Sequence, residues 1–204
     1  MQTQLKVMLE LQDAMNTRVN ENWRTKKFEW YRAIWVECAE LMDHYGWKWW
    51  KHQSPDVEQV KLELIDIWHF GLSILLQNNE SAPVVLMELE ESLGSQKSDD
   101  FRELLESFAE YTLANKDFSI PLFVSLMEAV GMDFDALYCG YVGKNVLNFF
   151  RQDHGYKDGS YIKVWNGKED NEHLVELVAE LDSSDHDFKD KLYALLEARY
   201  KQAQ

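Results

Sequence analysis

Residues 62–76 read LELIDIWHFGLSILL, and this stretch decides the fold class. Apolar side chains cover nearly every side of a helix built from it, which is typical of a helix buried inside a protein. The only formally charged residues in the stretch are Glu63 and Asp66, which are three positions apart and therefore share one helix face. The sequence thus predicts a buried helix over 56–77 that carries two acids where burial is costly.

Helical patterns continue on both sides of this stretch. Apolar residues recur at intervals of three and four, the period of an amphipathic helix, and the one short strand candidate is YIKVW at 161–165. Ser54 and Pro55 are expected to cap and begin the buried helix. We therefore predict an all-α fold, a multi-helix bundle with helices over residues 4–20, 28–45, 56–77, 83–93, 99–114, 119–130, 133–152, 170–181 and 185–202.

The composition argues against several classes of protein. A chain of 204 residues with 46% hydrophobic residues can form one core, and a net charge of −15 disfavours a nucleic-acid partner. Two cysteines cannot form a disulfide framework. No apolar run reaches the ~18 residues of a membrane span, and the N-terminal residues lack the layout of a signal peptide. We expect one soluble, cytoplasmic domain over 1–204, with no membrane partner.

A second pair of acids precedes the buried helix. Glu37 and Glu40 are also three positions apart, and the helix that carries them supplies no matching pair of bases. If the two helices pack antiparallel, as their short connector suggests, these acids converge with Glu63 and Asp66. Four carboxylates predict a site for a hard cation, and Mg²⁺ prefers such oxygens together with phosphates. A di-iron bundle would require the pattern Glu-x-x-His, which is absent.

A basic cluster lies later in the chain. Lys144, Asn148 and Arg151 follow one another at helical spacing and share one face, and a connector with glycines follows them. The cluster is either a solvated helix end or a phosphate site, to which the Arg151 guanidinium is suited. We expect residues 133–168 to move and to close over the ligand.

The two acid pairs resemble the all-α nucleoside triphosphate pyrophosphohydrolases, the MazG-like superfamily. Further segments are similar to the dimeric dUTPase family, namely LQDAMN at 11–16, WKWWK at 47–51, ELIDIWHF at 63–70 and KNVLNFFRQDHGYKDGSYIKVW at 144–165. The resemblance implies an all-α homodimer of this pyrophosphohydrolase type. It also implies hydrolysis of dUTP, and of dUDP, to dUMP, with two or more Mg²⁺ ions held by the four carboxylates.

The resemblance also implies individual roles. Glu40 matches the residue that activates the attacking water, and Gln12 and Asn16 match the amides that face uracil. The tryptophans of segment 47–51 match the wall beside the base and sugar, with Trp47 and Trp49 both candidates for the contact, and Lys48 lies between them as a further candidate. The residues that match phosphate and sugar contacts are Lys144, Asn148, Arg151, Tyr156, Lys157 and Lys163. His69 is either a core histidine with its hydrogen bonds satisfied or a contact to the substrate.

Two alternatives to this function remain. One is a related pyrophosphohydrolase that acts on dCTP, on both dCTP and dUTP, or on a modified nucleotide, and the second is a helical dimer module or nucleotide sensor without activity. The second is disfavoured because all four carboxylates and the basic cluster are present together. The chain has many large aromatic side chains, namely eight tryptophans, ten phenylalanines and nine tyrosines. A single chain of this length does not bury that much apolar surface by itself. We therefore expect a homodimer.

Overall fold

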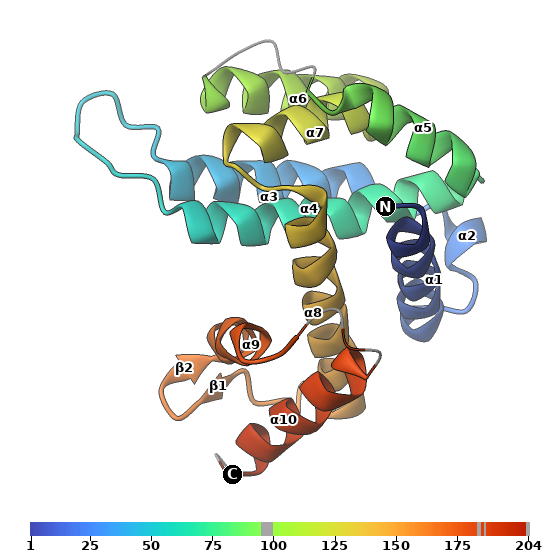
Figure 1. The fold of residues 1–204 in the computed structure, drawn as a ribbon, viewed down its shortest axis with the longest axis vertical. Helices are drawn as coiled ribbons and strands as arrows, with labels where there is room; N and C mark the ends of the chain where they lie inside the picture. Colours follow the sequence, from blue (N-terminus) through green and yellow to red (C-terminus); the bar gives the residue numbers. More distant parts are fainter. Residues whose placement is uncertain (95–99, 183–184, 186, 203–204) are drawn as a thin grey trace. The chain divides into compact units, whose positions relative to one another are not determined.

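A computed structural model describes residues 1–94, 100–182, 185 and 187–202 (Figure 1). These residues form ten helices and one two-stranded hairpin, so the predicted all-α fold is confirmed. The elements are α1 (Gln2–Val19), α2 (Trp23–Lys26), α3 (Trp30–Tyr45), α4 (Val57–Gln77), α5 (Ala82–Ser92), α6 (Phe101–Asn115), α7 (Ile120–Ala129), α8 (Phe134–Asp153), β1 (Val164–Trp165), β2 (Lys168–Glu169), α9 (Asp170–Ala179) and α10 (Phe188–Gln202).

The observed helices differ from the predicted ones in a few places. The short helix α2 was not expected, because a single turn carries no periodic pattern. Helix α4 begins at Val57, and the Asp56 side chain caps it by accepting a hydrogen bond from the backbone N–H of Gln59 at 3.3 Å. The expectation that Ser54 caps this helix was therefore wrong, since Asp56 is the acceptor one position before its first turn.

The chain divides into two compact units, Met1–Tyr138 and Cys139–Gln204, and the boundary falls inside α8. The expected single domain with a moving part over 133–168 stays a prediction. In the part of the chain that the structure describes, no helix is long and apolar enough to cross a membrane.

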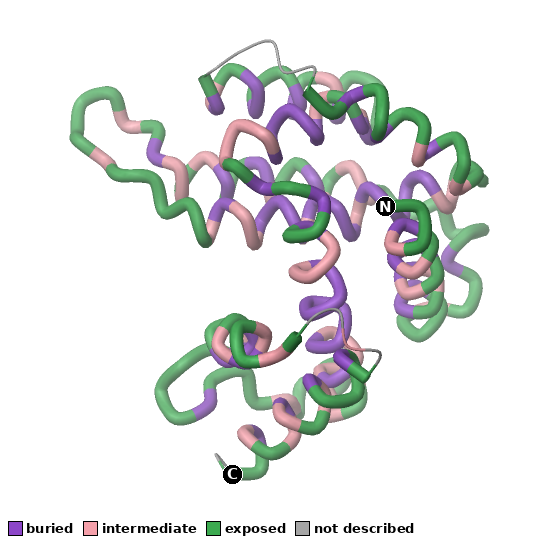
Figure 2. The backbone as a smooth tube through the Cα atoms, in the orientation of Figure 1, coloured by how far each residue is buried: buried purple, intermediate pink, exposed green. Residues whose placement is uncertain are grey.

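The first unit is built around α4, which is buried along most of its length (Figure 2). Trp68 is fully buried and stacks on Phe123, with ring centroids 5.2 Å apart. Gly71, one turn further along α4, allows close packing, because a Cβ atom there would lie 2.7 Å from the ring of Phe118. The predicted buried helix is thus the centre of the first unit's core.

Helices α3 and α4 run antiparallel, as expected. The indole N–H of Trp30, at the start of α3, donates to Gln77 at the end of α4. At the opposite end, the backbone N–H of Asp56 donates to the carbonyl of His44 at 3.0 Å. This pairing of ends sets the register in which the two acid pairs can meet.

The second unit has its own aromatic core. Phe150 on α8 is fully buried and contacts the rings of Trp165 and Tyr200. Trp165 belongs to the hairpin, in which Val164 pairs with Glu169 in an antiparallel register. The short strand expected at 161–165 is thus present in its last two residues, Val164–Trp165.

Candidate active site

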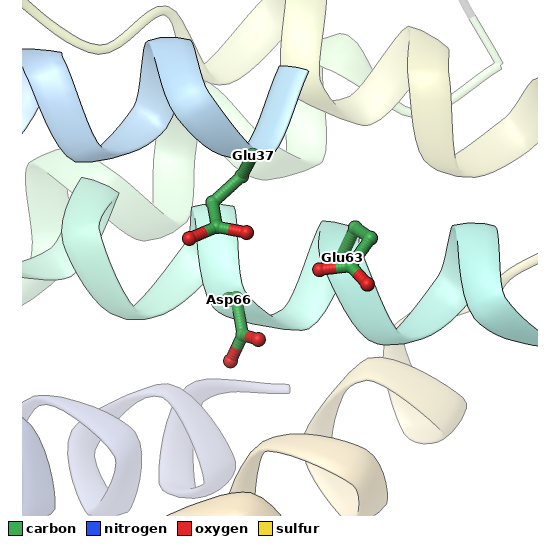
Figure 3. A group of neighbouring side chains, drawn as sticks. All are labelled: Glu37, Glu63 and Asp66. Atoms are coloured by element: carbon green, nitrogen blue, oxygen red, sulfur yellow. The ribbon is translucent and has the colours of Figure 1, made fainter. Parts of the chain in front are cut away.

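Three of the four predicted acids meet between α3 and α4. Glu37 extends from α3 toward α4, which carries Glu63 and Asp66 (Figure 3). One ligand atom from each of the three lies within 4.8 Å of the others. Glu63 is buried, and Glu37 and Asp66 are half-buried. The arrangement brings negative charges together at the edge of a core, where water screens them less than at the surface.

The chemistry of Glu37 reflects this crowding. Burial, followed by the charges of Asp66, Glu63 and Glu40, raises the pKa of Glu37 from 4.5 to about 8. A side-chain hydrogen bond with Glu63 raises it further, because it requires one of the two groups to be protonated. Without a cation, therefore, the Glu37 and Glu63 pair binds a proton more tightly than a carboxylate in water does.

The fourth acid has a different environment. Glu40 lies one turn further along α3 and is exposed, outside the group of three that meet most closely. His44, one more turn along α3, places its Nε2 atom 3.6 Å from a carboxylate oxygen of Glu63. The sequence analysis gave His44 no role. Its spacing of seven from Glu37 puts it on the same face of α3, and this spacing is a signal that could have found it.

A second polar group links α1 to α4. The Gln12 amide donates to Asn16 at 3.0 Å and to the Ser73 hydroxyl at 3.1 Å, and the Asn16 amide donates to the same hydroxyl at 2.9 Å. His69 Nδ1 lies 2.8 Å from the Gln12 carbonyl oxygen. All four residues are buried. The structure thus brings together Gln12 and Asn16, which the sequence analysis named for the base, and His69, which it left as either a core residue or a substrate contact.

In the second unit, Arg151 is held by an acid that the sequence analysis missed. Its Nε and Nη2 atoms each donate to Asp170 at 2.8 Å, a bidentate pair, and Nη1 donates to Asn148 at 3.2 Å. The Asp170 side chain is fully buried. Burial alone would raise the pKa of Asp170, but the hydrogen bonds and charge of Arg151 lower it. Tyr161 also donates to Asp170, at 2.8 Å.

The other residues predicted to contact phosphate do not join the hydrogen bonds that Arg151 makes with Asp170 and Asn148. Tyr156 lies near Arg151, whose guanidinium carbon is 6.0 Å from the centre of the ring. Lys157 is exposed, and Lys144 is buried. Lys163 forms an ion pair with Glu169 at 2.9 Å, so its charge already has a partner in the same unit.

The tryptophan segment 47–51 lies in the connector between α3 and α4. Trp47 is 45% exposed and Trp49 is 90% exposed, and Trp50 packs edge-on against both. The Lys48 ammonium lies 5.5 Å from the centre of the Trp47 ring. Trp47 also lines a cavity of about 390 Å³ with Trp35 and other apolar residues of α3 and α6. The exposed face of a single indole ring can stack on a base.

A family model described as dUTPase matches residues 4–156, three quarters of the chain. The chain belongs to the dUTPase family. It is therefore an enzyme that hydrolyses dUTP to dUMP, a dUTP diphosphatase. No curated protein matches the chain. The matched range contains both acid pairs of this dUTPase and the hydrogen-bonded group of Gln12, Asn16, His69 and Ser73, here called the amide network. It ends before Lys157 and Lys163.

The acidic cluster of this dUTPase could bind a metal, and dUTPases generally use Mg²⁺. Its donors are all carboxylate oxygens, the ligands that a hard cation prefers. The raised pKa of Glu37 also agrees with a metal site. Besides burial, crowded negative charge contributes to raising it, and a bound cation would neutralise that charge.

Proposed function

We propose that this dUTPase depends on Mg²⁺, acts on dUDP as well as dUTP, and works as a homodimer. The observation that carries the metal site is the convergence of Glu37, Glu63 and Asp66 within 4.8 Å, with Glu40 as the proposed fourth ligand. Bound Mg²⁺ would supply positive charge against the phosphates, and two or more ions are expected with substrate.

Glu40 is proposed to accept the proton of the attacking water. Its side chain is exposed, so water reaches it, and it lies one turn from Glu37 on the same helix. A positioned carboxylate that takes a proton in the transition state is a general base. Its place at the rim of the acidic cluster supports this role, because water there can lie between Glu40 and the phosphate chain.

The substrate contacts are proposed from the resemblance and from the way the side chains group. A buried amide network suits recognition of a base, and the guanidinium of Arg151 suits a phosphate. Residues 133–168 are proposed to close over the phosphates. The proposed substrate-binding residues are Gln12, Asn16, Trp47, Lys48, Trp49, His69, Lys144, Asn148, Arg151, Tyr156, Lys157 and Lys163.

The proposed homodimer is supported by exposed aromatic and aliphatic side chains of the first unit. Trp35 on α3 is 45% exposed and Val36 beside it is 51% exposed. Large apolar side chains grouped on a surface mark sites of association. A cytoplasmic location and the absence of nucleic-acid and membrane partners stay predictions.

The test is a panel of dUTP, dUDP, dCTP and dTTP, assayed for released pyrophosphate, or for phosphate in the case of dUDP. We expect turnover of dUTP and dUDP with Mg²⁺ and none with EDTA. Glu63→Gln is expected to abolish turnover, while Glu58→Gln keeps it. Glu58 is a matched control because it lies on the same helix with its side chain 80% exposed. Turnover that survives EDTA or Glu63→Gln would contradict the proposed metal site, and a preference for dCTP would identify a related pyrophosphohydrolase.

A further inference from the structure

Ser73 lies at the centre of the amide network between α1 and α4. It is fully buried on α4, and its hydroxyl donates to the backbone carbonyl of His69, one turn earlier, at 3.0 Å. A serine hydroxyl has one hydrogen to donate and two lone pairs that accept. Since its hydrogen goes to His69, the oxygen of Ser73 can only accept from Gln12 and Asn16.

This directionality fixes both amides. The NH₂ groups of Gln12 and Asn16 must face Ser73, because an amide oxygen there would meet a lone pair. The Gln12 carbonyl oxygen then faces His69, whose Nδ1 donates to it. The second N–H of Gln12 donates to the Asn16 oxygen. Within this network, one N–H of Asn16 is not used.

We propose that Ser73 is a positioning residue that sets the preference of this enzyme for uracil over cytosine. It holds the Asn16 amide so that the N–H not used in the network is offered to the base. At C4 of the base, uracil carries a carbonyl oxygen that accepts, whereas cytosine carries an amine that donates. A fixed donor therefore favours uracil and disfavours cytosine.

The inference rests on the proposed function, in which Gln12 and Asn16 face the base. Its new content is that a residue without a contact to the base controls the selectivity. Without the hydroxyl of Ser73, the Asn16 amide can turn over and offer its oxygen. An oxygen at that place accepts from the cytosine amine, so discrimination is lost even though both amides remain.

The experiment compares kcat/KM for dUTP and dCTP in the wild type and in Ser73→Ala, Ser73→Thr and Ser125→Ala. We expect the dUTP to dCTP ratio to fall about tenfold in Ser73→Ala, the effect of one misdirected hydrogen bond. Ser73→Thr keeps the hydroxyl and should keep the ratio. Ser125→Ala is the matched control, since Ser125 is also buried and donates to a carbonyl four residues earlier, that of Pro121, at 2.9 Å.

A merely structural role for Ser73 would lower stability and turnover of both substrates without changing their ratio, and that result overturns the inference. If Ser73→Ala does not fold, Ser73→Cys keeps the volume with a weaker acceptor, and an unchanged ratio there overturns the inference equally. The proposed function is tested separately by the wild type. A wild-type enzyme with no preference for dUTP refutes the proposed base site, whereas a preference that survives Ser73→Ala refutes the role of Ser73 alone.

Discussion

Replacing Glu37 by glutamine in the metal-free protein tests the electrostatics of the acidic cluster directly. Burial, and then the charges of Asp66, Glu63 and Glu40, raise the pKa of Glu37 from 4.5 to about 8. Glutamine has nearly the same shape and no charge. It therefore removes the titration while leaving the packing of α3 against α4 largely intact.

The sign of the effect follows from the raised pKa. The folded protein binds the Glu37 proton more tightly than the unfolded chain, so the free energy of unfolding falls as pH rises from 4.5 to about 8. A shift of this size corresponds to at most about 5 kcal/mol. Because Glu37 is only half-buried, water screens part of it, and we expect about 2 kcal/mol.

The measurement is urea unfolding in EDTA, followed by tryptophan fluorescence, at about pH 5 and about pH 9. Glu37→Gln should be more stable than the wild type by about 2 kcal/mol at the higher pH, with the difference shrinking toward the lower pH. Glu58→Gln, on the exposed face of α4, should show no such trend. A difference between Glu37→Gln and the wild type that is the same at both pH values would refute the reasoning.

Three further predictions concern the metal, the basic cluster and the assembly. Millimolar Mg²⁺ should raise the melting temperature of the wild type but not of Asp66→Asn, because a ligand that binds only the folded state stabilises it; equal shifts would count against the site. Arg151→Ala should weaken dUTP turnover strongly and leave Mg²⁺ binding, measured by calorimetry, nearly unchanged. It should also lower the free energy of unfolding by about 3 kcal/mol, because Asp170 is left buried without its partner. Unchanged kinetics would place the phosphate site elsewhere. Light scattering should give the mass of a dimer at micromolar concentration, and a monomer mass would end the dimer proposal.

Local patterns predicted the longer helices and three of the acids that meet between α3 and α4. The spacing of three between Glu63 and Asp66 is a property of one helix, and the short connector to α3 leaves few ways to pack the two helices. That is why the meeting of these acids with Glu37 could be predicted from the amino-acid sequence alone. The capping of α4 could not be read as reliably, because Ser54 and Asp56 are both good caps and only the backbone geometry selects Asp56.

Partners far apart in the sequence were not predictable. Arg151 pairs with Asp170, 19 residues further on, across a connector and a hairpin. Ser73 joins two amides of α1 that lie 57 and 61 residues away. Such contacts depend on how elements pack, which periodicity does not report. The spacing of four from His69 to Ser73 matches that from Gln12 to Asn16, but it becomes meaningful only once α1 lies against α4.

The first unit holds two polar groups, the three acids between α3 and α4 and the amide network between α1 and α4. They differ in whether their interactions are satisfied before a ligand binds, and this difference suits their proposed ligands. In the acidic cluster of Glu37, Glu63 and Asp66, burial and the meeting of like charges raise the pKa of Glu37, so the cluster binds a proton more tightly than free carboxylates do. Metal binding must then release that proton, and affinity should rise with pH. In the amide network each hydrogen bond supports the next, so its geometry is set before a base binds. A cation can be recognised by uncompensated negative charge, because the attraction between charges does not depend on orientation. Uracil differs from cytosine in whether the group at C4 and the ring N3 donate or accept a hydrogen bond, so its recognition requires amides that cannot turn over.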